Sequence, residues 1–280
     1  MLAHIVKMCF KVTKICICNA FVSIIIIFNQ SLYMLKALHN IGQYFSMLFQ
    51  VFNRPEKGKV YWKKIVHEMN ELGVNSLAIV SIISIFMGAV VAIQTGLQFE
   101  SPFIPKYLIG YATRESLILE FSPTMIALIL AGKVGSSIAS EIGTMRVTEQ
   151  IEALEIMGIN SKAFIIQPKI IATILFFPIL VVISMSVGMV GGYLAGTLGG
   201  LISHTDFMYG LHYWFEPYHI FYALVKTFFF AFIISSVSSY CGYYTEGGAL
   251  EVGKSSTRAV VFSSIVILIT NFTLTQLMLS

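Results

Sequence analysis

The chain has 280 residues; 56% of them are apolar, 11% are charged, and the mean hydropathy is +0.80. Soluble domains carry about 25% charged residues, so this composition excludes an ordinary soluble protein and predicts an α-helical membrane protein. A spanning helix needs about 20 mostly apolar residues, and several such runs follow one another with short polar stretches between them. We therefore expect one membrane domain. The net charge of +4 is small, and nothing in it supports nucleic-acid binding.

Residues 1–33 form an N-terminal extension with two possible origins. Three lysines precede the apolar run Ile15–Phe28, an order that resembles a signal peptide, but no convincing cleavage site follows. The run is also short for a membrane span. Met34 would be a sensible start, so an over-extended reading frame and a real membrane anchor both stay open. We assign the functional domain to residues 34–280.

Residues 35–66 are basic and rich in aromatic and aliphatic side chains. This amphipathic character is typical of a helix that lies along an anionic membrane face. We expect an interfacial helix on the cytoplasmic side, with a solvated basic loop as the alternative. The basic residues are Arg54, Lys57, Lys59, Lys63 and Lys64.

Five apolar stretches are long enough to cross a bilayer. The second includes Pro123 close to ionisable residues, and we expect it to be kinked. The third ends in a glycine-rich stretch, which favours close packing between helices. The predicted spans cover about residues 72–97, 107–132, 170–194, 220–243 and 259–279.

The loops between the predicted spans differ in charge. The loop 197–219 contains no Lys or Arg, whereas 133–169 contains four and 244–258 contains two. Cytoplasmic loops carry the excess of Lys and Arg in membrane proteins. Loops 133–169 and 244–258 are therefore expected in the cytoplasm.

The cytoplasmic stretch 133–169 is too long to be an ordinary connection, and its pattern predicts a helix with two apolar faces. A helix wedged between the membrane domain and a separate cytoplasmic protein needs two such faces. A helix lying on the bilayer is the alternative, but anionic lipid would repel its four glutamates. One face holds Val147, Ile151 and Leu154, and the other holds Ile142, Met145 and Ile156 among Glu141, Glu149 and Glu152.

Three stretches of the sequence resemble one known family. EIGTMRVTEQIEALEIMGI, preceded by AGKVGSS and followed by QPK, is similar to the signature of MlaE-type ABC transporter permeases, which include the YrbE and TGD-like subunits of Mce systems and chloroplast lipid importers. ELGVNSL and GYYTEGGALEVGKSSTRAVV extend the resemblance more loosely, from about Met34 to the C-terminus. Residues 1–33 lie outside it.

The resemblance implies a multi-pass permease of the inner membrane that works as a homodimer. Its implied partners are two cytoplasmic ATPase subunits, which would bind ATP and Mg²⁺, an MCE-domain protein on the outer side, and often a STAS-domain protein. The substrate would be a phospholipid or a related lipid. The chain itself would be non-catalytic and would hold no cofactor.

Carried over by position, the resemblance also implies two sets of functional residues. Glu141 to Gly158 would be the coupling helix that meets the ATPase, and Glu120 and Lys226 would lie near the lipid cavity. We place Gln94 with them, because it adds polarity to a face of the first span that we expect to meet protein or a cavity. The expected ATPase contacts are Glu141, Met145, Arg146, Glu149, Glu152, Glu155 and Met157.

The chain departs from the family pattern in three places. The family usually has Arg where Lys133 stands, often has Arg at Lys169, and has an Arg-Glu-Leu-Gly run where this chain reads Leu119 to Ser122. A lysine lacks the forked donor of an arginine. Phosphate contacts inferred from the family's arginines are therefore not carried over to this chain.

Ionisable residues inside the spans need partners. A charge at membrane depth is costly unless it meets an opposite charge or water, so we expect Glu120 and Lys226 to form an internal ion pair or to line a polar cavity. Such a pair either lines the path of a lipid headgroup or only joins two helices. For Arg114 and Glu115 we expect an exposed pair at the membrane edge, of little energetic weight.

The sequence shows neither a nucleotide site nor a metal site. AGKVGSS lacks the spacing of a phosphate-binding loop, and His204, His212 and His219 fit no compact metal motif. Energy must therefore come from another chain or from an ion gradient. An ion-coupled secondary transporter of a lipophilic substrate and an intramembrane lipid-modifying enzyme are the alternatives, but we find neither paired repeats nor a nucleophile with its base. A permease driven by a partner ATPase best explains the acidic cytoplasmic segment.

Overall fold

The computed structural model describes residues 38–52, 58–99 and 103–279. The chain divides into two compact units, Met1–Gln50 and Val51–Ser280. In the first unit, the residues from 38 onward form a helix with exposed apolar side chains every three or four positions, as expected for a helix in a membrane interface. The predicted extension of residues 1–33 lies outside the described residues. The exposed apolar side chains are Leu38, Ile41, Phe45 and Phe49.

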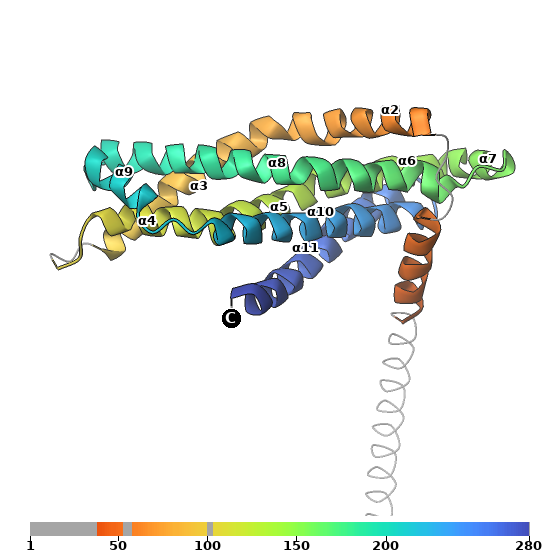
Figure 1. The fold of residues 1–280 in the computed structure, drawn as a ribbon. Coiled ribbons are helices and arrows are strands. Elements are labelled where there is room, and N and C mark those ends of the chain that lie inside the picture. The colour runs from red at the N-terminus through yellow and green to blue at the C-terminus, as the bar shows by residue number, and fades with distance from the viewer. Residues whose placement is uncertain (1–37, 53–57, 100–102, 280) are drawn as a thin grey trace, which may run out of the picture. The chain divides into compact units, whose positions relative to one another are not determined.

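Among the residues that the structure describes, five helical stretches, all in the second unit, are long and apolar enough to cross a membrane (Figure 1). This confirms the predicted all-α membrane fold with five spans. Each stretch is longer than the predicted span, because flanking polar residues are helical too. The stretches are Tyr61–Gln98, Tyr107–Val147, Ser161–Leu198, Pro217–Tyr243 and Ala249–Leu279.

Two of these stretches combine α-helical and π-helical pieces. The first consists of α2 (Gly58–Glu68), η1 (Met69–Val74) and α3 (Asn75–Gln98). The second consists of α4 (Tyr107–Ser116), η2 (Leu117–Met125), α5 (Ile126–Leu130), η3 (Ala131–Gly135) and α6 (Ser136–Val147). The remaining elements are α7 (Gln150–Ile156), α8 (Ser161–Leu198), α9 (His204–His212), α10 (Pro217–Tyr243) and α11 (Ala249–Leu279).

The polar segments next to the spans are largely built from the ends of spanning helices. Residues 58–66 of the predicted interfacial segment belong to α2, which continues through η1 into α3. Residues 133–147 likewise prolong the second stretch, and residues 161–169 begin α8. Between α6 and α8 the chain forms the separate short helix α7.

α7 and α9 lie at opposite ends of the second unit (Figure 1). α7 belongs to the loop that contains Lys and Arg, and α9 belongs to the loop 197–219 that contains neither. The start of α2 lies at the α7 end, and the end of α3 lies at the α9 end (Figure 1). The loop with four Lys and Arg and the loop 197–219 with none thus lie at opposite ends of the spanning helices, as the positive-inside rule requires. The loop before α4, with Lys106, lies at the α9 end.

The second stretch is irregular around Pro123. The π-helix η2 contains nine residues, and Pro123 lies inside it. Proline has no N–H to donate to the preceding turn, and π-helical turns occur frequently at functional sites. The irregularity expected at Pro123 is therefore present as a π-helical segment, and this segment also carries Glu120.

α11 buries little of its surface in the described chain. Five of its residues, on one stripe, are buried. At membrane depth, the remaining apolar surface contacts either lipid or another protein. The large exposed side chains include Val261, Phe262, Ile265, Ile269 and Phe272.

α3 and α8 pack so closely that backbone touches backbone. A Cβ atom added at Gly88 would overlap the carbonyl oxygen of Gly188, and one at Gly191 would overlap the backbone of Ile85. Small residues allow this approach between membrane helices. The close packing predicted for the glycine-rich third span is therefore confirmed.

Gly191→Ala should destabilise the protein by about 1 to 3 kcal/mol, the usual cost of overpacking a close contact. Gly253→Ala is the matched control, because Gly253 is also helical but has open space at its Cβ position. Thermal unfolding of both variants in detergent measures the difference. Equal melting temperatures for the two variants would contradict the packing of α3 against α8.

Candidate functional site in the membrane and at its cytoplasmic side

Glu120 of η2 and Lys226 of α10 form an ion pair inside the membrane-spanning part of the chain. The ammonium of Lys226 lies 2.6 Å from Glu120 Oε1. The Lys226 side chain is fully buried, whereas the Glu120 side chain is 42% exposed. The internal pair predicted from the sequence is present, and it is open on the carboxylate side.

Hydroxyl and amide groups complete the surroundings of the Glu120 carboxylate. The Asn271 amide and the Thr124 hydroxyl each donate to Oε2 at 3.1 Å, and the Thr275 hydroxyl lies 3.3 Å from Oε1. Asn271 and Thr275 belong to α11, so the site joins η2, α10 and α11. The carboxylate therefore has three polar neighbours besides the lysine.

Lys226 also contacts the irregular backbone of η2. Its ammonium lies 3.4 Å from the carbonyl oxygen of Leu119 and 4.4 Å from the ring centre of Tyr222. Pro123 cannot donate the α-helical hydrogen bond to the Leu119 carbonyl, because proline has no N–H. Lys226 thus supplies a donor to a buried carbonyl that lacks its α-helical one.

The structure does not bring Gln94, the third predicted cavity residue, to this pair. Its side chain is exposed on α3. Among the described residues, the hydrogen-bond donors to the Glu120 carboxylate come from η2, α10 and α11. The polar side chain of Gln94 in the first span therefore lies apart from the Glu120–Lys226 pair.

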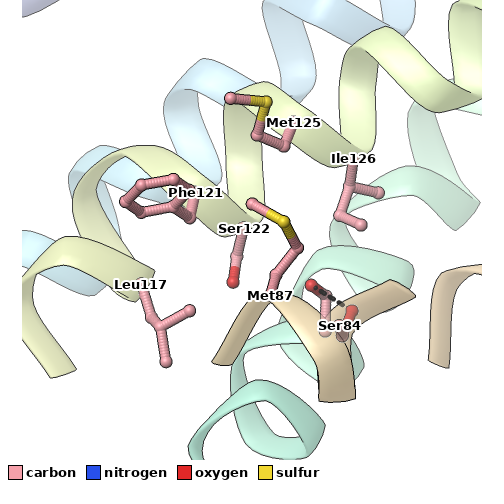
Figure 2. Close-up of a pocket in the computed structure, with 8 residues that line it drawn as sticks. Ser84, Met87, Leu117, Phe121, Ser122, Met125 and Ile126 are labelled. Atoms are coloured by element: carbon pink, nitrogen blue, oxygen red, sulfur yellow. Dashed lines mark hydrogen bonds between the residues drawn. The ribbon is translucent and has the colours of Figure 1, made fainter. Parts of the chain in front are cut away.

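A small pocket lined mainly by apolar side chains lies between α3, η2 and α8 (Figure 2). Phe121, which directly follows Glu120, lines it from η2, and Met87 lines it from α3. The Ser84 hydroxyl, bonded to that of Ser184 at 2.8 Å, is also part of the lining. The lining is mostly apolar, but a volume of about 10 Å³ has room for about one water molecule and for no acyl chain in this conformation. η2 therefore has the ion pair and an apolar pocket next to each other.

The predicted coupling helix, Glu141 to Gly158, consists of two helices with a turn between them, so the prediction of one continuous helix is wrong. α6 ends at Val147, and α7 begins at Gln150. Glu149 lies between them with a φ of 58°, a left-handed conformation that residues other than glycine rarely adopt. This turn interrupts the helical pattern, so the two apolar faces do not run through the whole segment.

α7 ends in a turn at Gly158. The N–H of Gly158 donates to the carbonyl of Glu155, and the N–H of Ile159 donates to the carbonyl of Leu154. Together with the φ of 77° at Gly158, these bonds form a Schellman motif, which favours glycine at this position. The turn directs the chain back towards α8.

Side chains connect α7 with the helices around it. Arg146 and Glu152 form a salt bridge of 2.8 Å. Glu155 accepts hydrogen bonds from the hydroxyls of Ser161 at 2.8 Å and Tyr243 at 3.0 Å. Two of the glutamates predicted to contact an ATPase are therefore engaged within the chain.

The free surface of α7 is apolar as well as acidic. Ile156 is 87% exposed and Met157 is 64% exposed, whereas Ile151 is fully buried. Glu149 is exposed in the turn before α7. Exposed apolar side chains grouped at one end of a protein are typical of an interaction surface.

The other predicted ATPase contacts lie in α6. Met145 and Arg146 are half-buried. Glu141 is exposed, but one of its carboxylate oxygens lies 2.7 Å from the ammonium of Lys169. These three side chains are therefore partly covered or paired by the chain's own helices.

A family model described as permease MlaE matches residues 65–277. The chain belongs to the MlaE permease family. The match runs from α2 to the last turn of α11. It therefore includes both the Glu120–Lys226 pair and α7.

Individual MlaE-family relatives cover most of the chain. A probable ABC transporter permease protein of Rickettsia bellii is 37% identical over 243 residues, which are 87% of this chain and 93% of that protein. The intermembrane phospholipid transport system permease protein MlaE of Haemophilus influenzae is 30% identical over 246 residues, 87% of this chain and 92% of that protein. The chloroplastic protein Trigalactosyldiacylglycerol 1 of Arabidopsis thaliana is 34% identical over 227 residues, 81% of this chain and 65% of that protein.

Arg114 in this MlaE-family chain is not part of an exposed membrane-edge pair, so that prediction is wrong. Its side chain is only 2% exposed. The guanidinium donates to Glu115, to one backbone carbonyl in the last turn of α9 and to two in the segment that follows it. Glu115 also pairs with His219 at 2.7 Å. Arg114 therefore holds the outer segment against α4. The three carbonyls belong to Leu211, Tyr213 and Trp214.

Thr124, Asn271 and Thr275 were not predicted as neighbours of Glu120. A signal was present, because Glu120 and Thr124 are four residues apart, as are Asn271 and Thr275. Positions i and i+4 share one face of a helix. Two polar pairs with this spacing in two apolar spans indicate faces that meet each other or a cavity.

Glu120→Gln should lower the stability of the protein more than Lys226→Met. The first change leaves a fully buried ammonium without its carboxylate, a situation that costs about 3 to 5 kcal/mol for buried pairs. The second leaves a part-exposed carboxylate that keeps three polar neighbours. Denaturation of the two variants in the same detergent compares them, and a larger loss for Lys226→Met would refute this order.

Glu155→Gln should loosen the attachment of α7 at neutral pH. The Ser161 hydroxyl is the main cause of a lowered pKa of Glu155; Tyr243, Arg146 and Lys162 act in the same direction, against the effect of burial. A lowered folded-state pKa means that this stabilisation is present above the ordinary carboxyl pKa and is lost as the pH falls through the lowered value. Hydrogen exchange of α7 amides, compared between variant and wild type at each pH, should differ at pH 7 and converge well below about pH 4. A difference that does not depend on pH would contradict this assignment.

Proposed function

We propose that this chain is the membrane permease subunit of an ABC transporter that moves phospholipid, or a related lipid, between the inner membrane and the cell envelope. A partner ATPase supplies the energy by binding and hydrolysing ATP with Mg²⁺. The observation that carries the proposal is the exposed apolar pair on α7, at the end of the second unit where the loops contain Lys and Arg. Membership of the MlaE family and the names of the relatives support it.

α7 is the docking helix for the ATPase in this proposal. Ile156 and Met157 enter a groove of the partner, and Glu149 meets basic residues at its edge. Glu152 and Glu155 set the position of α7 through Arg146 and Ser161. Of the predicted contacts, Met157 and Glu149 thus stay in the proposed docking face, and Ile156 is added to it.

The lipid path runs beside η2. A phospholipid needs polar contacts for its headgroup and an apolar surface for its acyl chains. Glu120, open on one side, offers the first at membrane depth. The pocket lined by Phe121 and Met87, with a volume of about 10 Å³ in this conformation, would have to widen to offer the second. Movement of η2 against α10 would change both surfaces together and so change lipid affinity, which a ligand-coupled transition requires.

Other subunits complete the transporter. The exposed apolar face of α11 provides a surface for a second copy of the chain. An MCE-domain protein would bind at the outer side, where α9 and the Arg114-held segment lie, and a STAS-domain protein would bind in the cytoplasm. The chain contributes conformational change and no covalent chemistry.

Ile156→Asp combined with Met157→Asp should reduce recovery of the ATPase with the tagged chain by at least about tenfold, the effect expected when central apolar anchors are lost. Leu198→Asp is the matched control, because Leu198 is an 83% exposed aliphatic residue at the opposite end of α8. The measurement is affinity purification in mild detergent with quantification of the ATPase and of bound phospholipid. Equal ATPase recovery from both variants would exclude α7 as the docking helix.

Purification of the wild-type chain tests the function itself. Recovery of an ATPase together with phospholipid is the expected result. A folded chain that retains neither would argue against the permease and favour an ion-coupled secondary transporter, in which Glu120 would be the ion-binding carboxylate. Lipid transfer in vesicles driven by ATP or by a proton gradient then distinguishes the two.

A further inference from the structure

The cytoplasmic ends of three helices meet at Lys169 of α8. The Lys169 ammonium lies 2.8 Å from both carboxylate oxygens of Glu68 in α2 and 2.7 Å from Glu141 Oε2 in α6. The lysine side chain is 2% exposed, and those of Glu68 and Glu141 are 15% and 48% exposed. One buried cation therefore joins α2, α6 and α8.

A second lysine, which belongs to α2, also connects α2 with α8. The ammonium of Lys64 in α2 lies 3.4 Å from the carbonyl oxygen of Phe164 and 3.3 Å from the centre of its ring. Pro168 cannot donate the α-helical hydrogen bond to this carbonyl. Lys64 reaches from α2 to α8, and Lys169 reaches from α8 to α2, so the two helices are fixed by contacts in both directions.

These contacts lie at the base of the hairpin that carries α7. Glu141 is six residues before the end of α6, and Lys169 is eight residues after the start of α8. At 1.5 Å per residue these separations are about 9 and 12 Å. A displacement of α7 would therefore act on the Lys169 cluster through two short, continuous helical segments.

The chemistry of the cluster suits transmission of movement better than simple stabilisation. A buried ion pair contributes little net stability compared with apolar packing, but it fixes which groups are partners. If Lys169 left Glu68, the lysine would keep only Glu141, and the Glu68 carboxylate, which is only 15% exposed, would lose its ion-pair partner. Slippage of α2 along α8 is therefore costly, whereas movement of the two helices together is not.

We propose that Lys169 is a positioning residue that couples α2, and with it the first span, to the α6–α7–α8 hairpin. When the partner ATPase displaces α7, Lys169 carries that displacement to α2 through Glu68. α2 then moves α3, with which it is continuous through η1. This inference rests on the proposed transport function.

The test measures lipid moved per ATP hydrolysed by the assembled transporter in vesicles of defined phospholipid. Lys169→Met removes the charge and keeps a side chain of similar length. Lys169→Arg keeps the charge and can bond to two carboxylates. Lys106→Met, at an exposed position before α4, is the control for loss of a lysine elsewhere.

Lys169→Met should assemble with the ATPase and hydrolyse ATP while moving about tenfold less lipid per ATP, within the usual range for a coupling between two sites. Lys169→Arg and Lys106→Met should keep the wild-type ratio. An unchanged ratio in Lys169→Met, even with reduced protein abundance, would overturn the inference and leave Lys169 with a stabilising role only.

Glu68→Gln serves where Lys169→Met fails to fold, because it retains the Lys169–Glu141 pair and breaks only the link to α2. Its ratio should fall as well, and an unchanged ratio would equally overturn the inference. Failure of the wild-type chain to bind an ATPase or to move lipid would instead refute the proposed function, and the inference with it. Transport by the wild type with a normal ratio in both variants would refute the inference alone.

Discussion

The packing of this protein depends on supplying a partner to the fully buried ammonium of Lys226. A charge at membrane depth is costly unless it is paired, and here the partners are Glu120 and the Leu119 carbonyl on η2. Glu120 in turn binds Asn271 of α11. Because apolar side chains gain little by leaving lipid for one another, this polar junction gives α11, which buries few residues, a defined place against η2 and α10.

On the other side of η2, helices pack through close backbone contact. α3 and α8 meet through Gly88, Gly188 and Gly191, where no side chain could move out of the way. η2 lies between this close-packed pair and the polar junction, and the pocket lined by Phe121 and Met87 lies on the side of α3 and α8. The π-helical backbone around Pro123 thus has close backbone packing on one side and polar side-chain contacts on the other.

The sequence predicted features that arise from short-range chemistry. The five spans follow from apolar runs, the close packing of the third span from its glycine-rich end, and the Glu120–Lys226 pair from the cost of unpaired charge. The buried state of Arg114 could not be predicted, because its acceptors are backbone carbonyls about a hundred residues further along the chain. The turn at Glu149 could not be predicted either. Left-handed turns are predicted from glycine or asparagine, and here the residue is a glutamate.

Two lysines make the same kind of contact in different surroundings. Each contacts a backbone carbonyl that lacks its α-helical donor because a proline stands four residues later. Lys226 contacts the Leu119 carbonyl before Pro123, and Lys64 contacts the Phe164 carbonyl before Pro168. In the membrane the neighbouring carboxylate of Glu120 is 42% exposed, and in the proposed function a lipid headgroup would exchange with its present partners there. Near α7 the cluster of Lys169 keeps its cation closed between two carboxylates. In the proposed mechanism, partners exchange at Glu120 but stay fixed at Lys169. A displacement of α7 must pass through the Lys169 cluster before it can change the surroundings of Glu120.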